Sequence, residues 1–144
     1  MSTLKRILLI LLLFILYTFI SAFSYAETVS ADISDNVFRL HIIANSDSDE
    51  DQNLKLLVRD SILEYMKEIS YDVSTKDEII SLMNNHLSNF YEIAISTIRN
   101  AGLDYDVNLS IGNFSFPTKT YGNVSLPSGM YDALRVEIGN ASRT

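Results

Sequence analysis

The chain of 144 residues contains no cysteine and no tryptophan, and it has only two histidines and two prolines. Without cysteine it can form no disulfide, thiolate metal site or cysteine nucleophile. Basic residues are also few, because 11 Lys and Arg stand against 18 Asp and Glu, giving a formal net charge of -7. Nucleic acids and anionic membrane surfaces are bound mainly through Lys and Arg, so this balance argues against both as partners.

Apolar residues make up 47% of the chain, and many of them lie at the N-terminus. Lys5 and Arg6 precede an uncharged apolar run from Ile7 to Ile20, and Ser24-Tyr25-Ala26 places small residues at the -3 and -1 positions of a cleavage site. We therefore predict a secretory signal peptide over residues 1–26, with transient membrane contact and cleavage after Ala26. An uncleaved membrane anchor is the alternative interpretation. In both cases the remainder of the chain is exported.

The exported part divides into a short lead-in and one domain. Residues 27–36 mix small and acidic residues without an apolar period, which predicts a flexible segment. Residues 37–144 are expected to form a single domain, which begins with an alternating strand from Val37 to Ala44. The apolar residues of this strand lie on one face, whereas Arg39 and His41 lie on the other.

Two helices and three further strands follow. The first helix is predicted from near Ser48 to around Ile69, and the second from a Thr75–Glu78 capping box to a C-cap at Gly102. The strands are expected at Tyr105–Ile111, Phe116–Tyr121 and Tyr131–Ile138, with turns at Gly112-Asn113 and Pro127-Ser128-Gly129. This order predicts an α+β fold in which two helices cover one face of a mainly antiparallel sheet. The pattern leaves open which strand pairs with the first one.

The acidic residues and histidines offer little for metal chemistry. Asp47-x-Asp49-x-Asp51 matches the first half of an EF-hand calcium loop, but Gln52 and Val58 replace the glycine and the bidentate glutamate of the second half. A helix cap is the stronger interpretation of these carboxylates. His41 and His86 lack the His-x-x-x-His spacing of a zinc enzyme. We predict neither a metal nor another cofactor.

Motifs for nucleophilic catalysis are missing as well. The exported part contains neither a Gly-x-Ser-x-Gly elbow nor a Ser-x-x-Lys motif, so we predict no catalytic residues and no enzymatic activity. A Ser-His-Asp arrangement assembled only in three dimensions would escape this test. An exported hydrolase acting on cell-wall or peptide substrates is therefore the alternative function.

Two segments resemble the stage II sporulation protein R family of endospore-forming bacteria. The first is Arg39-Leu40-His41-Ile42-Ile43-Ala44-Asn45-Ser46-Asp47-Ser48, followed by Asp51-Gln52-x-Leu54-Lys55-x-x-Val58-Arg59-Asp60. The second is Phe116-Pro117-Thr118-Lys119-Thr120-Tyr121-Gly122, followed by Leu126-Pro127-x-Gly129-x-Tyr131-x-Ala133-Leu134-Arg135. The resemblance extends over residues 36–139 and the signal sequence.

This resemblance implies an exported signalling protein that is not itself an enzyme. Such a protein is made in the forespore and secreted into the intermembrane space between forespore and mother cell. There it activates a membrane-embedded aspartic protease of the mother cell, stage II sporulation protein GA. The protease in turn processes the precursor of sigma-E.

The expected partner-binding residues are the exposed polar positions of the two motifs: Arg39, His41, Asn45, Asp47, Lys119 and Tyr121. Lys119 and Tyr121 lie between Pro117 and Gly122, in a segment that we interpret as an exposed strand edge. Gln52, Lys55 and Arg59 flank the apolar face of the first helix and are further candidates. The alternative interpretation is structural, with Asn45 and Asp47 capping that helix and Arg39 pairing with a nearby acid.

The C-terminus departs from the family pattern. Family members continue beyond the position of Gly139 into a glycine-rich turn and a tail with tryptophan and cysteine, whereas Asn140 to Thr144 follow here. We therefore expect a C-terminally truncated member. Loss of a terminal strand would leave an unpaired sheet edge, and an inactive remnant is a further alternative.

Overall fold

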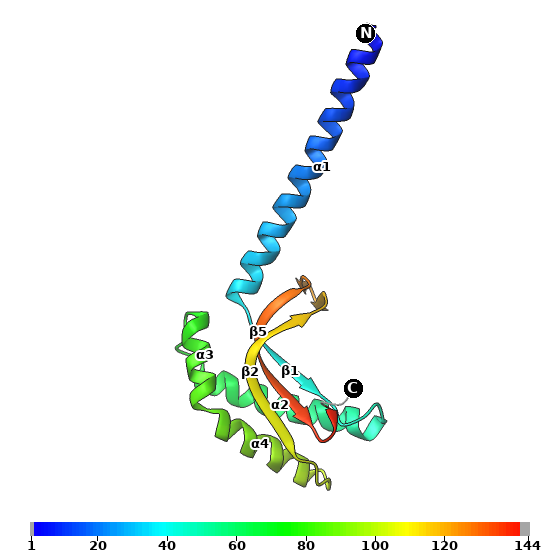
Figure 1. Cartoon of the computed structure of the whole chain (residues 1–144). Coiled ribbons are helices and arrows are strands. Elements are labelled where there is room, and N and C mark those ends of the chain that lie inside the picture. The colour runs from blue at the N-terminus through cyan, green and yellow to red at the C-terminus, as the bar shows by residue number, and fades with distance from the viewer. Residues whose placement is uncertain (1, 142–144) are drawn as a thin grey trace.

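A long helix, α1 (Thr3–Asn36), extends away from the rest of the molecule in the computed structural model, which describes residues 2–141 (Figure 1). None of its residues is buried, and its length and hydropathy suffice to cross a membrane. A helix of this kind near the N-terminus is consistent with a signal sequence or a membrane anchor. Residues 27–36, for which the sequence predicted a flexible lead-in, are helical in the structure, because no glycine or proline stops the helix after the apolar run.

Three strands form the main sheet, in the order β1 (Phe38–Ile43), β5 (Gly129–Ile138) and β2 (Val107–Phe116). β1 runs parallel to β5, and β2 runs antiparallel to it. The sheet is therefore mixed, and β5 is the partner of the first strand that the sequence pattern left open. Within residues 2–141, no strand pairs with the outer edge of β1.

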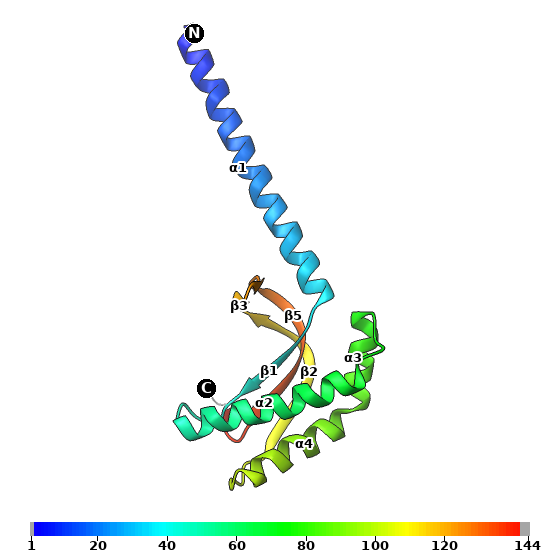
Figure 2. The same cartoon turned by 180° about the vertical axis from the view of Figure 1, so that it is seen from behind.

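Three helices lie on one side of this sheet: α2 (Asp49–Ile69), α3 (Lys76–Asn85) and α4 (Leu87–Asn100) (Figures 1 and 2). The core lies between these helices and the sheet, and β1 contributes alternate residues to it, as predicted. Its fully buried members include Val58, Ile62, Phe90, Ala94, Ile98, Leu134, Val136 and Ile138. The predicted α+β fold is confirmed.

The predicted cap residues position these helices. The Ser48 hydroxyl accepts a hydrogen bond from the Asp51 amide at 3.2 Å, and Thr75 forms a capping box with Glu78. Gly102 follows α4 with a φ of +82°, the left-handed conformation that ends many helices. These signals act within a single helical turn, which explains why the local sequence reveals them.

The second predicted helix is in fact two helices, α3 and α4, which differ in direction (Figure 1). The chain leaves the helical conformation at His86, with a φ of -106° and a ψ of 11°. The Nδ1 atom of His86 lies 2.7 Å from the hydroxyl of Tyr65 in α2. The break lets α4 turn its apolar face, including Phe90, into the core.

The predicted turn at Gly112-Asn113 is wrong, because both residues continue β2. They lie opposite Ala133 and Asp132 of β5. A Cβ at Gly112 would lie 3.2 Å from the Phe114 ring, so glycine at this position makes room for an aromatic side chain inside the strand.

A hairpin replaces the predicted strand Phe116–Tyr121. Phe116 ends β2, and β3 (Lys119–Tyr121) then pairs with β4 (Val124–Leu126), a strand that we did not predict. Gly122 lies in the turn between them with a φ of +60°. The hairpin carries Lys119 and Tyr121 beside β1 and α2, where they line a common hollow with both elements.

Candidate partner-binding site

Arg39 lies on the sheet face opposite the helices, among aromatic side chains. Its guanidinium carbon is 4.1 Å from the centre of the Phe116 ring and 4.8 Å from that of Tyr131. Arg39 is only 8% exposed, and its Nη2 atom donates to the Tyr121 hydroxyl at 3.4 Å. No carboxylate in residues 2–141 forms an ion pair with Arg39. The alternative expectation, that Arg39 pairs with a nearby acid, is therefore wrong for this part of the chain. The Nη1 atom is buried without a hydrogen-bond partner in this part of the chain.

His41 lies on the same face, two residues further along β1. Its ring centre is 5.2 Å from that of Phe116. Burial holds the pKa of His41 below its usual value of 6.5, and the cations of Arg135 and Arg39 lower it further. His41 is therefore neutral at pH 7 and offers a polar, uncharged ring beside the Arg39 cation.

Adjoining hollows follow the outer edge of β1. Arg39 of β1, Arg59 of α2 and Tyr121 of the hairpin line the first one, and His41, Lys55 and Lys119 line the second. These two hollows share Leu40, Arg59 and Tyr121, and we call them together the β1–α2 groove. Successive β1 residues point to opposite faces, so a groove that they line in common lies at the edge of the strand.

The β1–α2 groove is cationic, although the chain as a whole is acidic. It is lined by Arg39, Lys55, Arg59 and Lys119, and by no Asp or Glu of the part of the chain that the structure describes. Arg59 pairs at 2.7 Å with exposed Asp60, and the Lys55 Nζ atom donates to a Gln52 side-chain oxygen at 2.6 Å. The groove thus combines positive charge with apolar surface from Leu40, Leu56, Leu63 and Leu126.

Asn45 holds two loops together at the far end of β1. Its Nδ2 atom donates to an Asp51 carboxylate oxygen at 2.9 Å, and its Oδ1 atom accepts from the Asn140 amide at 2.9 Å. Asp51 is 3% exposed and also accepts from the Ser46 hydroxyl at 2.6 Å. The hydrogen bonds from Ser46 and Asn45 hold the pKa of Asp51 below its usual value of 3.8. Asn45 therefore has a structural role, but the side chain that caps α2 belongs to Ser48.

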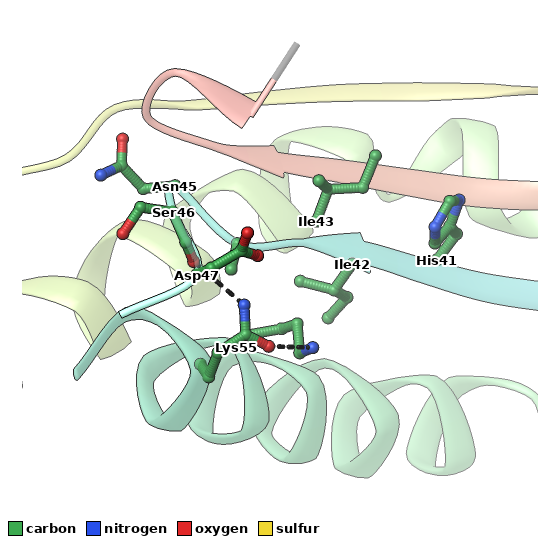
Figure 3. Close-up of a pocket in the computed structure, with 9 residues that line it drawn as sticks. His41, Ile42, Ile43, Asn45, Ser46, Asp47 and Lys55 are labelled. Atoms are coloured by element: carbon green, nitrogen blue, oxygen red, sulfur yellow. Dashed lines mark hydrogen bonds between the residues drawn. The ribbon is translucent and has the colours of Figure 1, made fainter. Parts of the chain in front are cut away.

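A third hollow adjoins this end of the groove and contains Asp47 (Figure 3). It is lined by residues 41–47 together with Gln52 and Lys55. The Gln52 side chain connects α2 to the loop that follows β1, because its Nε2 atom donates a hydrogen bond to the Ser46 carbonyl oxygen at 3.0 Å. Asp47 is exposed here and is separate from the β1–α2 groove.

Four of the six expected site residues meet in the groove: Arg39, His41, Lys119 and Tyr121. Asn45 and Asp47 line the neighbouring hollow instead. The further candidates Lys55 and Arg59 line the groove, whereas Gln52 lines the neighbouring hollow. The expected site residues did not include Leu56, Leu63 and Leu126, which also line the groove. The second family motif contains Leu126, which was the available signal for that residue.

The geometry around the histidines does not form a nucleophile–base pair. His86 contacts the Tyr65 hydroxyl, and neither histidine hydrogen-bonds a serine or a carboxylate within residues 2–141. In the same range, no group of three His, Asp or Glu side chains lies close enough to hold a metal ion. What the described residues do assemble is a cationic groove along the outer edge of β1, with which no other strand in residues 2–141 pairs.

Comparison with known proteins agrees with the two sequence motifs. A model of the family described as stage II sporulation protein R matches residues 34–143. The stage II sporulation protein R of Bacillus subtilis strain 168 is 34% identical over 115 residues, which cover 80% of this chain and 51% of that relative. The chain thus spans about half the length of the curated relative, and no solved structure matches it. The chain belongs to the stage II sporulation protein R family.

Proposed function

We propose that this chain is an exported sporulation signal that activates the membrane-embedded aspartic protease stage II sporulation protein GA, leading to processing of the sigma-E precursor. Family membership implies a role in stage II sporulation signalling. The finer step, contact with the protease, is supported by one observation above all. The β1–α2 groove gathers residues from both family motifs into a cationic surface at the outer edge of β1, which pairs with no strand of the described chain.

Export into the space between forespore and mother cell is supported by α1. This helix is apolar, exposed and near the N-terminus, as expected of a segment that enters the secretion pathway. N-terminal sequencing of the exported protein distinguishes a cleaved signal peptide from an uncleaved membrane anchor. A mature chain that begins at Glu27 indicates cleavage after Ala26, whereas an intact N-terminus indicates a membrane anchor. A protein that stays in the forespore cytoplasm contradicts both.

The test of the signalling role is complementation. We would express the unaltered 144-residue chain from a forespore promoter in a strain that lacks its own stage II sporulation protein R, and follow cleavage of the sigma-E precursor by immunoblot. The proposal expects cleavage to be restored. As controls, the same strain receives an empty vector and a chain without residues 1–26, which stays in the forespore.

The result that contradicts the proposal is equally clear. If the chain accumulates outside the forespore membrane and the sigma-E precursor stays uncleaved, the exported domain does not activate the protease. Immunoblotting the chain itself in the same samples distinguishes this outcome from poor expression.

A further inference from the structure

We propose that the β1–α2 groove receives an extended, acidic peptide segment of the partner protein, which pairs as an added strand with the outer edge of β1 and places a carboxylate on Arg39. This inference rests on the proposed function, because it describes how the same site holds its partner. Three features of the groove carry it: the free strand edge, the charge of the lining and the unpaired cation.

The free edge provides the backbone partners. β1 is the first strand in the order β1-β5-β2, so its outer side faces no other strand in residues 2–141. An edge strand offers N–H and C=O groups with which an extended peptide can pair. The six residues of β1 span about 20 Å, which fits a partner segment of similar length.

The charge of the groove favours an acidic segment. Among residues 2–141, four basic residues line the groove, Arg39, Lys55, Arg59 and Lys119, and no Asp or Glu does, whereas the net charge of the chain is -7. Of these four, only Arg59 forms an ion pair within that range, with Asp60 outside the lining. Complementary charge across an interface speeds association and disfavours partners of the wrong sign. A basic segment would be repelled from this groove.

Arg39 provides the most specific contact. Burying a charge without a partner is costly, so a buried guanidinium is ordinarily paired with a carboxylate. Arg39 lines the groove at 8% exposure, forms no ion pair in the described chain and leaves Nη1 without a hydrogen-bond partner there. The rings of Phe116 and Tyr131 offset part of this cost. A carboxylate from the bound segment would supply the missing anion.

Apolar residues beside these cations indicate the pattern of the bound segment. Leu56 of α2 and Leu126 of β4 line the groove next to the basic side chains. The side chains of an extended strand alternate between two directions. We therefore expect a segment in which Asp or Glu alternates with Val, Ile, Leu or Thr.

Selection from a phage-displayed library of random ten-residue peptides on the full chain in nonionic detergent tests this occupant. Enriched peptides should show the alternating acidic pattern. Their affinity, measured by fluorescence anisotropy, should fall at least about tenfold on Arg39→Met and on Lys119→Gln. Lys67→Gln is the matched control, because Lys67 is exposed on α2 outside the groove, and binding should stay within about twofold.

Two changes in the peptide test the mode of binding. Replacing its carboxylates by amides removes the charge, and methylating alternate backbone nitrogens removes the strand pairing. Each should weaken binding by at least about tenfold. Lys119 is exposed, so Lys119→Gln is expected to fold even if Arg39→Met does not, and circular dichroism checks both.

Several outcomes would overturn the inference: no enriched peptide, enriched peptides without carboxylates, or equal binding to the groove variants and the control. Binding of phosphatidylglycerol vesicles through Arg39 and Lys119 without any peptide would also overturn it, in favour of a lipid surface. The sigma-E assay on the unaltered chain separates the two claims. If the sigma-E precursor is cleaved but no acidic peptide is selected, only the proposed peptide ligand is wrong. If acidic peptides are selected but the precursor stays uncleaved, the proposed function is wrong.

Discussion

The guanidinium carbon of Arg39 lies 4.1 Å from the centre of the Phe116 ring, although the two residues come from the opposite edge strands of the sheet. The aromatic ring holds the cation by its negative face without neutralising its charge. A carboxylate of the same chain in the position of the Phe116 ring would instead have neutralised the Arg39 guanidinium in an internal ion pair. The contact therefore leaves the positive charge of Arg39 without an anionic partner in residues 2–141.

The first prediction concerns the stability that this charge contributes. Because Arg39 is buried and forms no ion pair within residues 2–141, Arg39→Met should change the free energy of unfolding by less than about 1 kcal/mol. Arg39→Ala should cost about 2 kcal/mol or more, because it also removes the packing of the side chain on two rings. Urea unfolding of the full chain in detergent measures both. If both variants lost the same large amount of unfolding free energy, the positive charge of Arg39 would itself stabilise the fold, which would contradict this prediction.

Gly139 provides the second prediction. It has a φ of +60°, and a Cβ there would collide with the side chain of Asn45. Gly122 has the same φ with nothing nearby, so Gly122→Ala isolates the backbone cost, about 1 kcal/mol. Gly139→Ala should cost about 2–4 kcal/mol in chemical unfolding, since it also displaces Asn45 from Asn140. Similar losses for the two variants would contradict this role of Asn45.

The third prediction tests the buried carboxylate at the start of α2. Asp51→Asn weakens the acceptor of Asn45 and Ser46 and should cost about 1–3 kcal/mol. Exposed Asp49 in the same helical turn is the control, and Asp49→Asn should cost less than about 1 kcal/mol. Because the pKa of Asp51 is lowered, its contribution is present above pH 3.8 and is lost as the pH falls through the folded-state pKa. The acid slope of the unfolding free energy should therefore be shallower in Asp51→Asn.

His41 gives the fourth prediction, in a different pH window. Its folded-state pKa lies below 6.5, so the unfolded chain takes up a proton more readily than the folded protein. The free energy of unfolding should be unaffected by this group above pH 6.5 and should fall as the pH drops through the folded-state pKa. His41→Gln should reduce the decrease measured between pH 7 and pH 5. An unchanged decrease would contradict the assigned pKa direction.

The parts of the fold that sequence predicted are those set by neighbouring residues. The alternation along β1 and the caps at Ser48 and Thr75 depend on contacts within a few residues. At the break between α3 and α4, His86 contacts Tyr65 of another helix, and β2 continues through Gly112 in pairing with β5. A single sequence does not reveal such long-range contacts.

The same distinction applies to the site. The two family motifs identified Arg39, His41, Lys119 and Tyr121, which the structure brings together in the groove. The aromatic surroundings of Arg39 were not predicted, because they are contributed by two other strands. The sequence predicted an unpaired sheet edge but not its position beside Arg39, because that position depends on the order of strands in the sheet.

The most direct test of the central claim is sigma-E precursor cleavage supported by groove variants in a strain that lacks its own stage II sporulation protein R. The account predicts normal cleavage with the unaltered chain and with Lys67→Gln. It predicts cleavage reduced at least about tenfold with Arg39→Met and with Lys119→Gln, at equal amounts of exported protein. Normal cleavage with both groove variants would show that the protease is activated through another surface.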